Sequence, residues 1–256
     1  MTPSPLISVI MPMYNAAGTL EASVRSVIDQ EFQDWELLLI DDASRDASLE
    51  MARTLASTEP RIRVVALESN LGAAGARNAG VNVSYGRYIA YLDSDDLWLP
   101  AKLRRQIEDI QVHPVDISFT DYRWMKADGT PLDVVVSAQD TPTWNDLTWG
   151  NNIGLSTALI DRSRLGSPQM PNIRLNHDYA MWLDLLRRGF LARRLPETLV
   201  LYRMTPGSLS QNKIESAQHN WRILRQVEGL PLHKVLPRML VWALRTGLRR
   251  ARLLPR

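Results

Sequence analysis

The chain has 256 residues, 45% hydrophobic and 23% charged, a composition typical of a globular protein with a full core. It contains no cysteine, which excludes disulfides, thiolate catalysis and cysteine-ligated zinc. The N-terminus does not have the pattern of a signal peptide, and no run of 18 or more apolar residues predicts a membrane-spanning helix. These features predict a cytoplasmic protein.

The net charge of +2 conceals two regions of opposite sign. Residues 191–256 hold 13 Lys and Arg against 3 Asp and Glu, a net charge of +10, so residues 1–190 carry −8. An acidic body argues against nucleic-acid binding. The separate basic tail indicates a second role for the C-terminal segment.

The first 95 residues alternate between short apolar segments and amphipathic ones. We predict strands at 6–13, 35–40, 61–67 and 85–92, and helices at 17–30, 47–57 and 73–83. This alternation, with its short connections, predicts an α/β fold with an open, mostly parallel sheet covered by helices on both faces.

After residue 100 the pattern becomes mixed. We predict helices at 101–111 and 176–188, and strands at 115–124, 153–160, 191–195 and 199–203. The resulting division is a main domain of residues 1–204 and a basic helical extension of residues 205–256. Within the main domain, residues 1–99 form the first half and residues 100–204 the second.

Polar clusters follow each of the first four predicted strands. They are Tyr14-Asn15, Asp41-Asp42, residues 68–72 and residues 93–96. In parallel sheets ligands bind beyond the carboxyl ends of the strands. The four clusters therefore predict one ligand site at this edge.

The sequence Asp93-Ser94-Asp95-Asp96 follows a buried strand. Two carboxylates two residues apart can approach one hard cation, such as Mg²⁺ or Mn²⁺, together with a phosphate group. Alternatively, these aspartates cap the helix that begins near Pro100. The spacing leaves both interpretations open, and we expect Asp96 to cap while Asp93 and Asp95 remain available to a metal.

Three further groups of residues have one chemical and one structural interpretation each. Asp41 and Asp42 accept a hydrogen bond from a nucleotide base, cap the next helix, or divide the two roles between them. Arg77, on a helix rich in Gly and Ala, either binds a diphosphate or belongs to a helix packed closely on the sheet. Asp178 either acts as a general base or stabilises the N-terminus of its helix, and His177 lines the site or faces solvent.

The order and spacing of these clusters strongly resemble the family 2 glycosyltransferases, which have the GT-A (Rossmann-like) fold. The matching stretches are residues 7–48, 70–103 and 176–189. The resemblance implies roles for individual residues: Pro12 and Tyr14 at the base, Asp42 with Asp41 beside it as the base acceptor, Asn70, Gly72, Arg77, Asp93 and Ser94 in the donor pocket, Asp93 and Asp95 for Mn²⁺ or Mg²⁺, and Asp178 as the base. The family usually has Glu before this last aspartate, and His177 departs from that pattern.

The resemblance also implies the reaction, a single inverting displacement on a nucleotide-sugar donor, with a UDP-sugar favoured. Residues 205–225 resemble bacterial surface-polysaccharide transferases, whose acceptor is a glycan, often linked to a polyprenyl diphosphate lipid. The basic, apolar-faced segment 234–252 either lies on an anionic membrane, at the inner face of the plasma membrane, or docks on the enzyme or a partner.

Two rival functions are less well supported. A sugar-phosphate nucleotidyltransferase is expected to have a glycine-rich, basic loop after the first strand, where this chain has Pro12, Met13, Tyr14 and Asn15. A non-catalytic protein that binds nucleotide sugars within an assembly would be expected to lack the metal aspartates or the base. Asp93, Asp95 and Asp178 are all present.

Overall fold

The computed structural model describes residues 4–204 and 213–251. Its first half consists of β1 (Ile7–Met13), α1 (Leu20–Ile28), β2 (Trp35–Asp41), α2 (Ser48–Thr58), β3 (Ile62–Ala66), α3 (Gly72–Val83) and β4 (Tyr88–Tyr91). The four strands are mutually parallel in the order β3-β2-β1-β4. The α/β fold and the chain order predicted for this half are confirmed.

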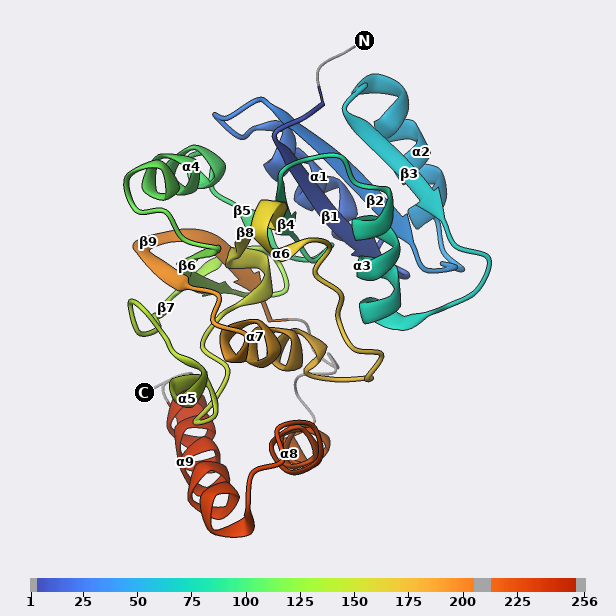
Figure 1. Ribbon diagram of the computed structural model, residues 1–256. Helices are drawn as coiled ribbons and strands as arrows, with labels where there is room; N and C mark the ends of the chain where they lie inside the picture. Colours follow the sequence, from blue (N-terminus) through green and yellow to red (C-terminus); the bar gives the residue numbers. More distant parts are fainter. Residues whose placement is uncertain (1–3, 205–212, 252–256) are drawn as a thin grey trace.

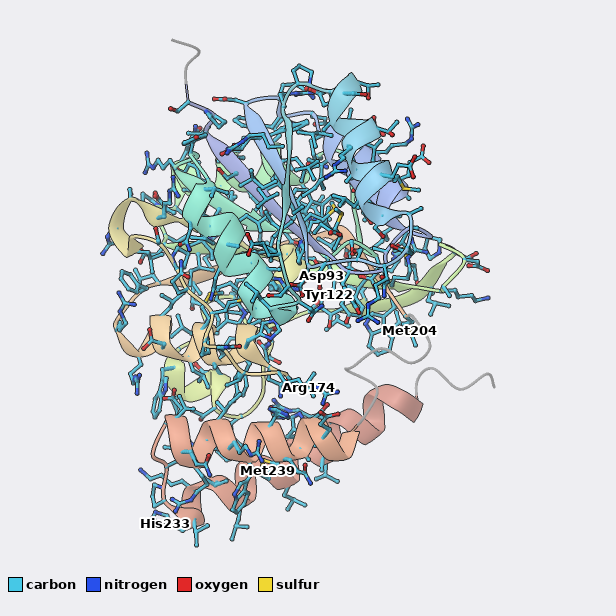
Figure 2. The ribbon with its side chains drawn as sticks, turned by 90° about the vertical axis from the view of Figure 1, so that its right-hand side faces the viewer. Asp93, Tyr122, Arg174, Met204, His233 and Met239 are labelled. Atoms are coloured by element: carbon cyan, nitrogen blue, oxygen red, sulfur yellow. The ribbon has the colours of Figure 1, made fainter. Side chains whose placement is uncertain are left out.

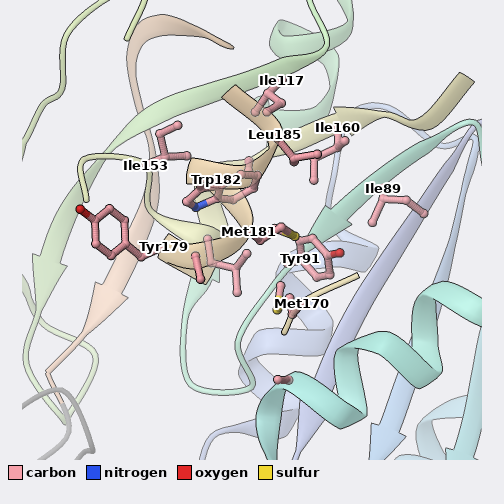
Figure 3. Close-up of a cluster of buried hydrophobic side chains, with 14 of the residues drawn as sticks. Ile89, Tyr91, Ile117, Ile153, Ile160, Met170, Tyr179, Met181, Trp182 and Leu185 are labelled. Atoms are coloured by element: carbon pink, nitrogen blue, oxygen red, sulfur yellow. The ribbon is translucent and has the colours of Figure 1, made fainter. Parts of the chain in front are cut away.

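Helices cover both faces of this parallel sheet (Figure 1). On one face α1, α2 and the later helix α4 (Lys102–Val112) pack against side chains such as Val9, Leu37 and Leu39. On the other face α3 and the later helix α7 (His177–Arg187) pack against Ile10, Leu38 and Tyr91, and Figure 3 shows Met181 of α7 beside Tyr91. Because both faces are covered, the inner strands are continuous apolar runs, and every residue of β2 is buried.

The second half adds β5 (Leu97–Trp98), α4 (Lys102–Val112), β6 (Ile117–Met125), β7 (Pro131–Val136), α5 (Trp144–Leu147), the 3₁₀ turn η1 (Leu155–Thr157), β8 (Leu159–Asp161), α6 (Arg162–Leu165), α7 (His177–Arg187) and β9 (Ala192–Arg203). The strand order of the whole sheet is β3-β2-β1-β4-β8-β6-β9-β5, with β7 beside β6. β8 runs antiparallel to β4 and β6, whereas β6 and β9 are parallel. The sheet is therefore parallel in its first half and mixed in its second.

Two predicted segments differ from the structure. The strand predicted at 153–160 is a 3₁₀ turn followed by the three-residue strand β8. The two strands predicted around Pro196 are one strand, β9, whose register against β6 shifts between Leu195 and Thr198. Proline has no N–H to donate to a neighbouring strand, and the shift takes it out of the regular ladder.

The C-terminal part contains α8 (Lys213–Arg222), a π-helical turn η3 (Ile223–Val227) and α9 (Leu232–Ala251). These helices lie at the end of the molecule remote from α2 (Figure 1). Val235 of α9 joins Leu224 and Leu230 in a small buried cluster. Within the described ranges, no helix is both long and apolar enough to cross a membrane.

Candidate functional site

The loops that leave β1 and β2 are hydrogen-bonded to each other. The Asn15 N–H donates to Ser44 Oγ at 3.1 Å, and the Arg45 N–H donates to Asn15 Oδ1 at 2.8 Å. Asn15 has a left-handed backbone with φ of 51°, which asparagine tolerates better than most residues. The parallel strands end at the same edge, so their exit loops form one continuous surface.

The loop before α3 is attached to the same surface through Asp42. One oxygen of its buried carboxylate accepts from the Leu71 N–H at 2.7 Å, and its backbone carbonyl accepts from Asn70 Nδ2 at 3.0 Å. Asp41 Oδ2 accepts from the Ser44 N–H at 3.3 Å. Its Oδ1 is buried with no hydrogen-bond partner among the described residues.

These contacts exclude one structural interpretation of the aspartate pair. The N-cap of α2 is Ala47, which has no side-chain cap. Asp41 and Asp42 therefore do not cap α2. Asp42 instead connects the loop after β2 to the segment before α3, and the Asp41 carboxylate bonds within its own loop.

Arg77 on α3 occupies the centre of the site and is 5% exposed. Its Nη2 donates to Asp93 Oδ1, and its Nη1 lies 2.5 Å from His177 Nε2. The pKa of His177 is lowered by burial and then by the positive charge of Arg77, so the neutral ring accepts the hydrogen bond from the guanidinium. In this structure the Nη groups predicted to bind diphosphate contact protein groups, and they connect β4 to α7.

The aspartate loop after β4 is a tight turn in which the Asp96 N–H donates to the Asp93 carbonyl at 3.0 Å. Asp96 is 1% exposed, and its carboxylate accepts from Ser156 Oγ at 2.7 Å and from the Arg203 N–H at 2.9 Å. Arg203 Nε also donates to the Asp95 carbonyl at 2.6 Å. The loop is thus fixed by η1 and by the end of β9, and Figure 2 shows Asp93 near the centre of the molecule.

The helix cap predicted for Asp96 is wrong. The N-cap of α4 is Ala101, which has no side-chain cap. The carboxylate of Asp96 is instead directed inward, to Ser156 and Arg203. The reason is that it pairs with groups far along the chain rather than with the N–H groups of the next helix.

The aspartates of this loop act on one another electrostatically. The pKa of Asp96 is raised well above its usual value by burial and then by the negative charges of Asp93 and Asp95, which favours the protonated form of Asp96 and leaves Asp93 and Asp95 as the candidate metal ligands. No group of three or more Asp, Glu, His or Cys side chains in the described part of the chain has a metal-binding arrangement. Mg²⁺ is commonly held by one or two carboxylates together with substrate phosphates and water. Asp93 and Asp95 fit that donor set.

Asp178 lies in the first turn of α7, after Asn176, which has a left-handed backbone with φ of 58°. Its half-buried carboxylate accepts from Asn151 Nδ2 at 3.0 Å. The charges of Asp178 and Asp93 both act on the pKa of His177, so the predicted base lies close to the donor-side network. Sequence analysis missed Asn151, because it lies in an irregular loop that has no motif.

The remaining predicted residues lie around the same edge. Tyr14 follows β1 directly and is 47% exposed, whereas Pro12 and Ser94 are half-buried. Gly72 begins α3 with φ of 75°, a backbone conformation that favours glycine. A surface cavity of about 540 Å³ lies elsewhere, lined by residues near Leu6, Tyr85 and Arg162, and contains none of the predicted site residues.

The family model and the relatives that match this chain agree on one protein family. Residues 8–162, more than half of the chain, match the family model described as Glycosyl transferase family 2. TuaG of Bacillus subtilis, whose name assigns it to teichuronic acid biosynthesis, is 43% identical over 230 residues, covering 90% of this chain and 91% of TuaG. WfgD of Escherichia coli, a UDP-Glc:alpha-D-GlcNAc-diphosphoundecaprenol beta-1,3-glucosyltransferase, is 32% identical over 238 residues, covering 90% of this chain and 89% of WfgD.

Solved structures share the fold at low sequence identity. Staphylococcus aureus TarS 1–349 in complex with UDP-GlcNAc has a TM-score of 0.70 and 17% identity, and the match covers 86% of this chain but only 64% of that one. The mannosyltransferase PcManGT from Pyrobaculum calidifontis, in complex with GDP-Man and Mn²⁺, has a TM-score of 0.67 and 20% identity, with 94% and 70% covered. The fold is therefore that of the GT-A glycosyltransferases.

Proposed function

The chain belongs to glycosyl transferase family 2 and is a glycosyltransferase, and we propose that it transfers a sugar, with inversion, from a UDP-sugar to a glycan of a bacterial surface polysaccharide. The names of TuaG and WfgD support this class of product and acceptor. A donor with UDP is favoured because WfgD is named for UDP-Glc and TarS was solved with UDP-GlcNAc.

The observation that best supports the proposal is the chain of contacts Asp93–Arg77–His177. It connects the loop after β4, where we assign the donor diphosphate, to the first turn of α7. Asp178 is the next residue on that turn. A transferase needs its donor site and its acceptor base within reach of one reacting bond, and this chain of contacts supports the proposal on that ground.

In the proposed reaction Asp178 takes the proton of the acceptor hydroxyl while the acceptor oxygen attacks the anomeric carbon. The bond between that carbon and the diphosphate oxygen breaks in the same displacement, so the configuration inverts and no sugar–enzyme bond forms. Asn151 orients the Asp178 carboxylate through its hydrogen bond. Asp93 and Asp95 are the residues that would hold Mn²⁺ or Mg²⁺, which supplies charge stabilisation to the departing diphosphate.

The remaining site assignments are also part of the proposal. Tyr14, beside Pro12, stacks on the nucleotide base of the donor. The aspartate pair Asp41 and Asp42 accepts the N–H of that nucleotide base. Asp41 Oδ1 is buried and lacks a hydrogen-bond partner among the described residues, whereas Asp42 uses one carboxylate oxygen to accept from Leu71. We keep Asp42 as the base acceptor, through its other oxygen, with Asp41 beside it.

We propose further that the acceptor is attached to a polyprenyl diphosphate lipid, as in the name of WfgD. Such an acceptor lies at a membrane surface, so the enzyme would work as a peripheral protein at the inner face of the plasma membrane. The basic tail, with its net charge of +10 over residues 191–256, is consistent with that location.

A donor screen tests the proposal. Purified protein is incubated with Mn²⁺ or Mg²⁺ and a panel of nucleotide sugars, and both donor hydrolysis and thermal stability are measured. We expect a UDP-sugar to raise the melting temperature and to be consumed, with metal present. Transfer to a synthetic lipid-diphosphate glycan should give a product of inverted anomeric configuration by NMR. If no nucleotide sugar is consumed or stabilises the protein, the proposal is wrong.

A further inference from the structure

Helix α9 exposes a row of four leucines. Leu232, Leu236, Leu240 and Leu244 are 51%, 58%, 62% and 58% exposed. At 3.6 residues per turn, a spacing of four residues keeps successive side chains on one side of the helix, with a slow rotation along it. We call these four residues the leucine face. Large aliphatic side chains arranged in this way mark a surface that contacts something apolar.

The opposite side of α9 is attached to the body of the enzyme. Val235 is fully buried and Arg238 is 8% exposed. Arg238 Nε donates to Thr148 Oγ1 at 2.7 Å, and its guanidinium lies 4.5 Å from the ring centre of Trp149. These contacts fix the rotation of the helix, so the leucine face points away from the body. Docking on the enzyme and contact with an outside surface are therefore compatible, one on each side of the helix.

The charge of the C-terminal segment indicates what kind of surface the leucine face contacts. Residues 232–256 contain seven Lys and Arg and no Asp or Glu. Lys234 and Arg245 of the same helix are exposed, and α9 lies at an outer edge of the molecule, where Figure 2 labels His233 and Met239. An exposed apolar face on a helix that carries basic residues and no acidic ones suits the interface of an anionic bilayer. A second copy of the helix would bring like charges together, which opposes dimerisation through this face.

We propose that the leucine face of α9 inserts into the headgroup region of an anionic membrane. The net charge of −8 on residues 1–190 repels the same surface, so the molecule is oriented with α9 toward the lipid. The biological purpose, delivery of the enzyme to a lipid-linked acceptor, rests on the proposed function. The lipid contact itself requires neither donor nor acceptor.

The experiment is co-sedimentation of the full chain with vesicles of phosphatidylglycerol and phosphatidylcholine in equal parts, and with vesicles of phosphatidylcholine alone. We expect the wild type to bind the anionic vesicles and to lose binding as salt is raised. Leu240→Glu should weaken that binding by about tenfold or more, since it removes a leucine that would be buried in the lipid and adds a negative charge. The matched control is Leu191→Glu, at a leucine next to β9 and outside the C-terminal helices that is also 58% exposed.

A second variant, Lys234→Gln/Arg245→Gln, isolates the electrostatic part and should weaken binding at low salt while leaving the melting temperature unchanged. The inference is overturned if the wild type does not bind anionic vesicles at low salt, or if Leu240→Glu binds as the wild type does. It is also overturned if the wild type forms a dimer that Leu240→Glu abolishes and does not bind vesicles. Vesicle binding without turnover of any donor would contradict the proposed function and support the lipid contact.

Discussion

Arg77 on α3 and Asp93 after β4 form an ion pair in which one guanidinium nitrogen donates to the carboxylate. The Arg77 side chain is 6% exposed and that of Asp93 is 30% exposed. The other terminal nitrogen of Arg77 lies 2.5 Å from His177 Nε2. One planar group therefore connects three segments that are distant in sequence. Only arginine has donors spaced to do this, because the lysine ammonium is a single point of charge.

Arg77→Lys should lower kcat/KM by roughly 10- to 100-fold, because the aspartate loop and α7 lose their common partner. We expect the free energy of unfolding to fall by about 1–2 kcal/mol, since a lysine keeps the charge but makes fewer hydrogen bonds. Steady-state kinetics and urea denaturation measure the two effects. The control is Arg63→Lys on β3, whose partly exposed side chain forms an ion pair with Glu36 of β2. Unchanged kcat/KM in Arg77→Lys would contradict the role of the network.

Asp95→Asn should abolish metal-dependent transfer, with a loss of about 10³-fold in kcat or more, because a carbonyl oxygen binds a divalent cation more weakly than a carboxylate. The melting temperature should stay within a few degrees of the wild type. A titration of activity with Mn²⁺, together with a thermal melt, makes the test. Asp133→Asn, an exposed aspartate on β7, is the control. Transfer at the wild-type level in Asp95→Asn would exclude Asp95 as a metal ligand.

The first half of the fold is readable from the sequence because its signals are local. Each parallel strand is a short apolar run buried on both faces, as in β1 and β2, and each helix repeats its apolar residues every three or four positions. The second half has weaker signals. β5 has only two residues, and β7 alternates between exposed and half-buried positions, so neither resembles a buried strand.

The residues of the candidate site likewise differ in how far the sequence predicts them. Asp93, Asp95 and Asp178 stand out because they follow a strand or begin a helix in a familiar order. Asp96 was misassigned because a carboxylate shortly before a helix resembles a cap. Its partner Arg203 lies 107 residues away, and pairings at such separations leave no pattern in the local sequence. The same holds for Asn151.

A further prediction concerns Lys102, which is fully buried on α4. Its ammonium donates to Gln106 Oε1 at 2.8 Å and lies 3.9 Å from the centre of the Trp98 ring. Burial lowers its pKa well below 10.5. Between the lowered value and 10.5 the unfolded chain binds more protons than the folded protein, so the free energy of unfolding should rise with pH in that window.

Lys102→Met should remove this pH dependence and raise the free energy of unfolding near neutral pH by on the order of 1 kcal/mol, because position 102 then no longer buries a charge. Urea denaturation of wild type and variant at pH 7 and at about pH 9.5 measures the difference. The two proteins should converge in stability at the higher pH. A constant difference between them at both pH values would show that Lys102 titrates alike in the folded and unfolded chain.

The last prediction concerns Asp178, the proposed base. Asp178→Asn should lower kcat by about 10²- to 10⁴-fold, because an amide cannot take the acceptor proton. The KM for the donor and the stabilisation by nucleotide should change little, since the donor contacts belong to other strands. Asp184→Asn provides the matched control, being the same substitution on the same helix at a side chain that is 45% exposed and paired with Arg187. If Asp178 merely stabilised the N-terminus of α7, its replacement would lower the melting temperature and leave kcat near that of the control. A fall in kcat at an unchanged melting temperature therefore separates a catalytic role from a structural one.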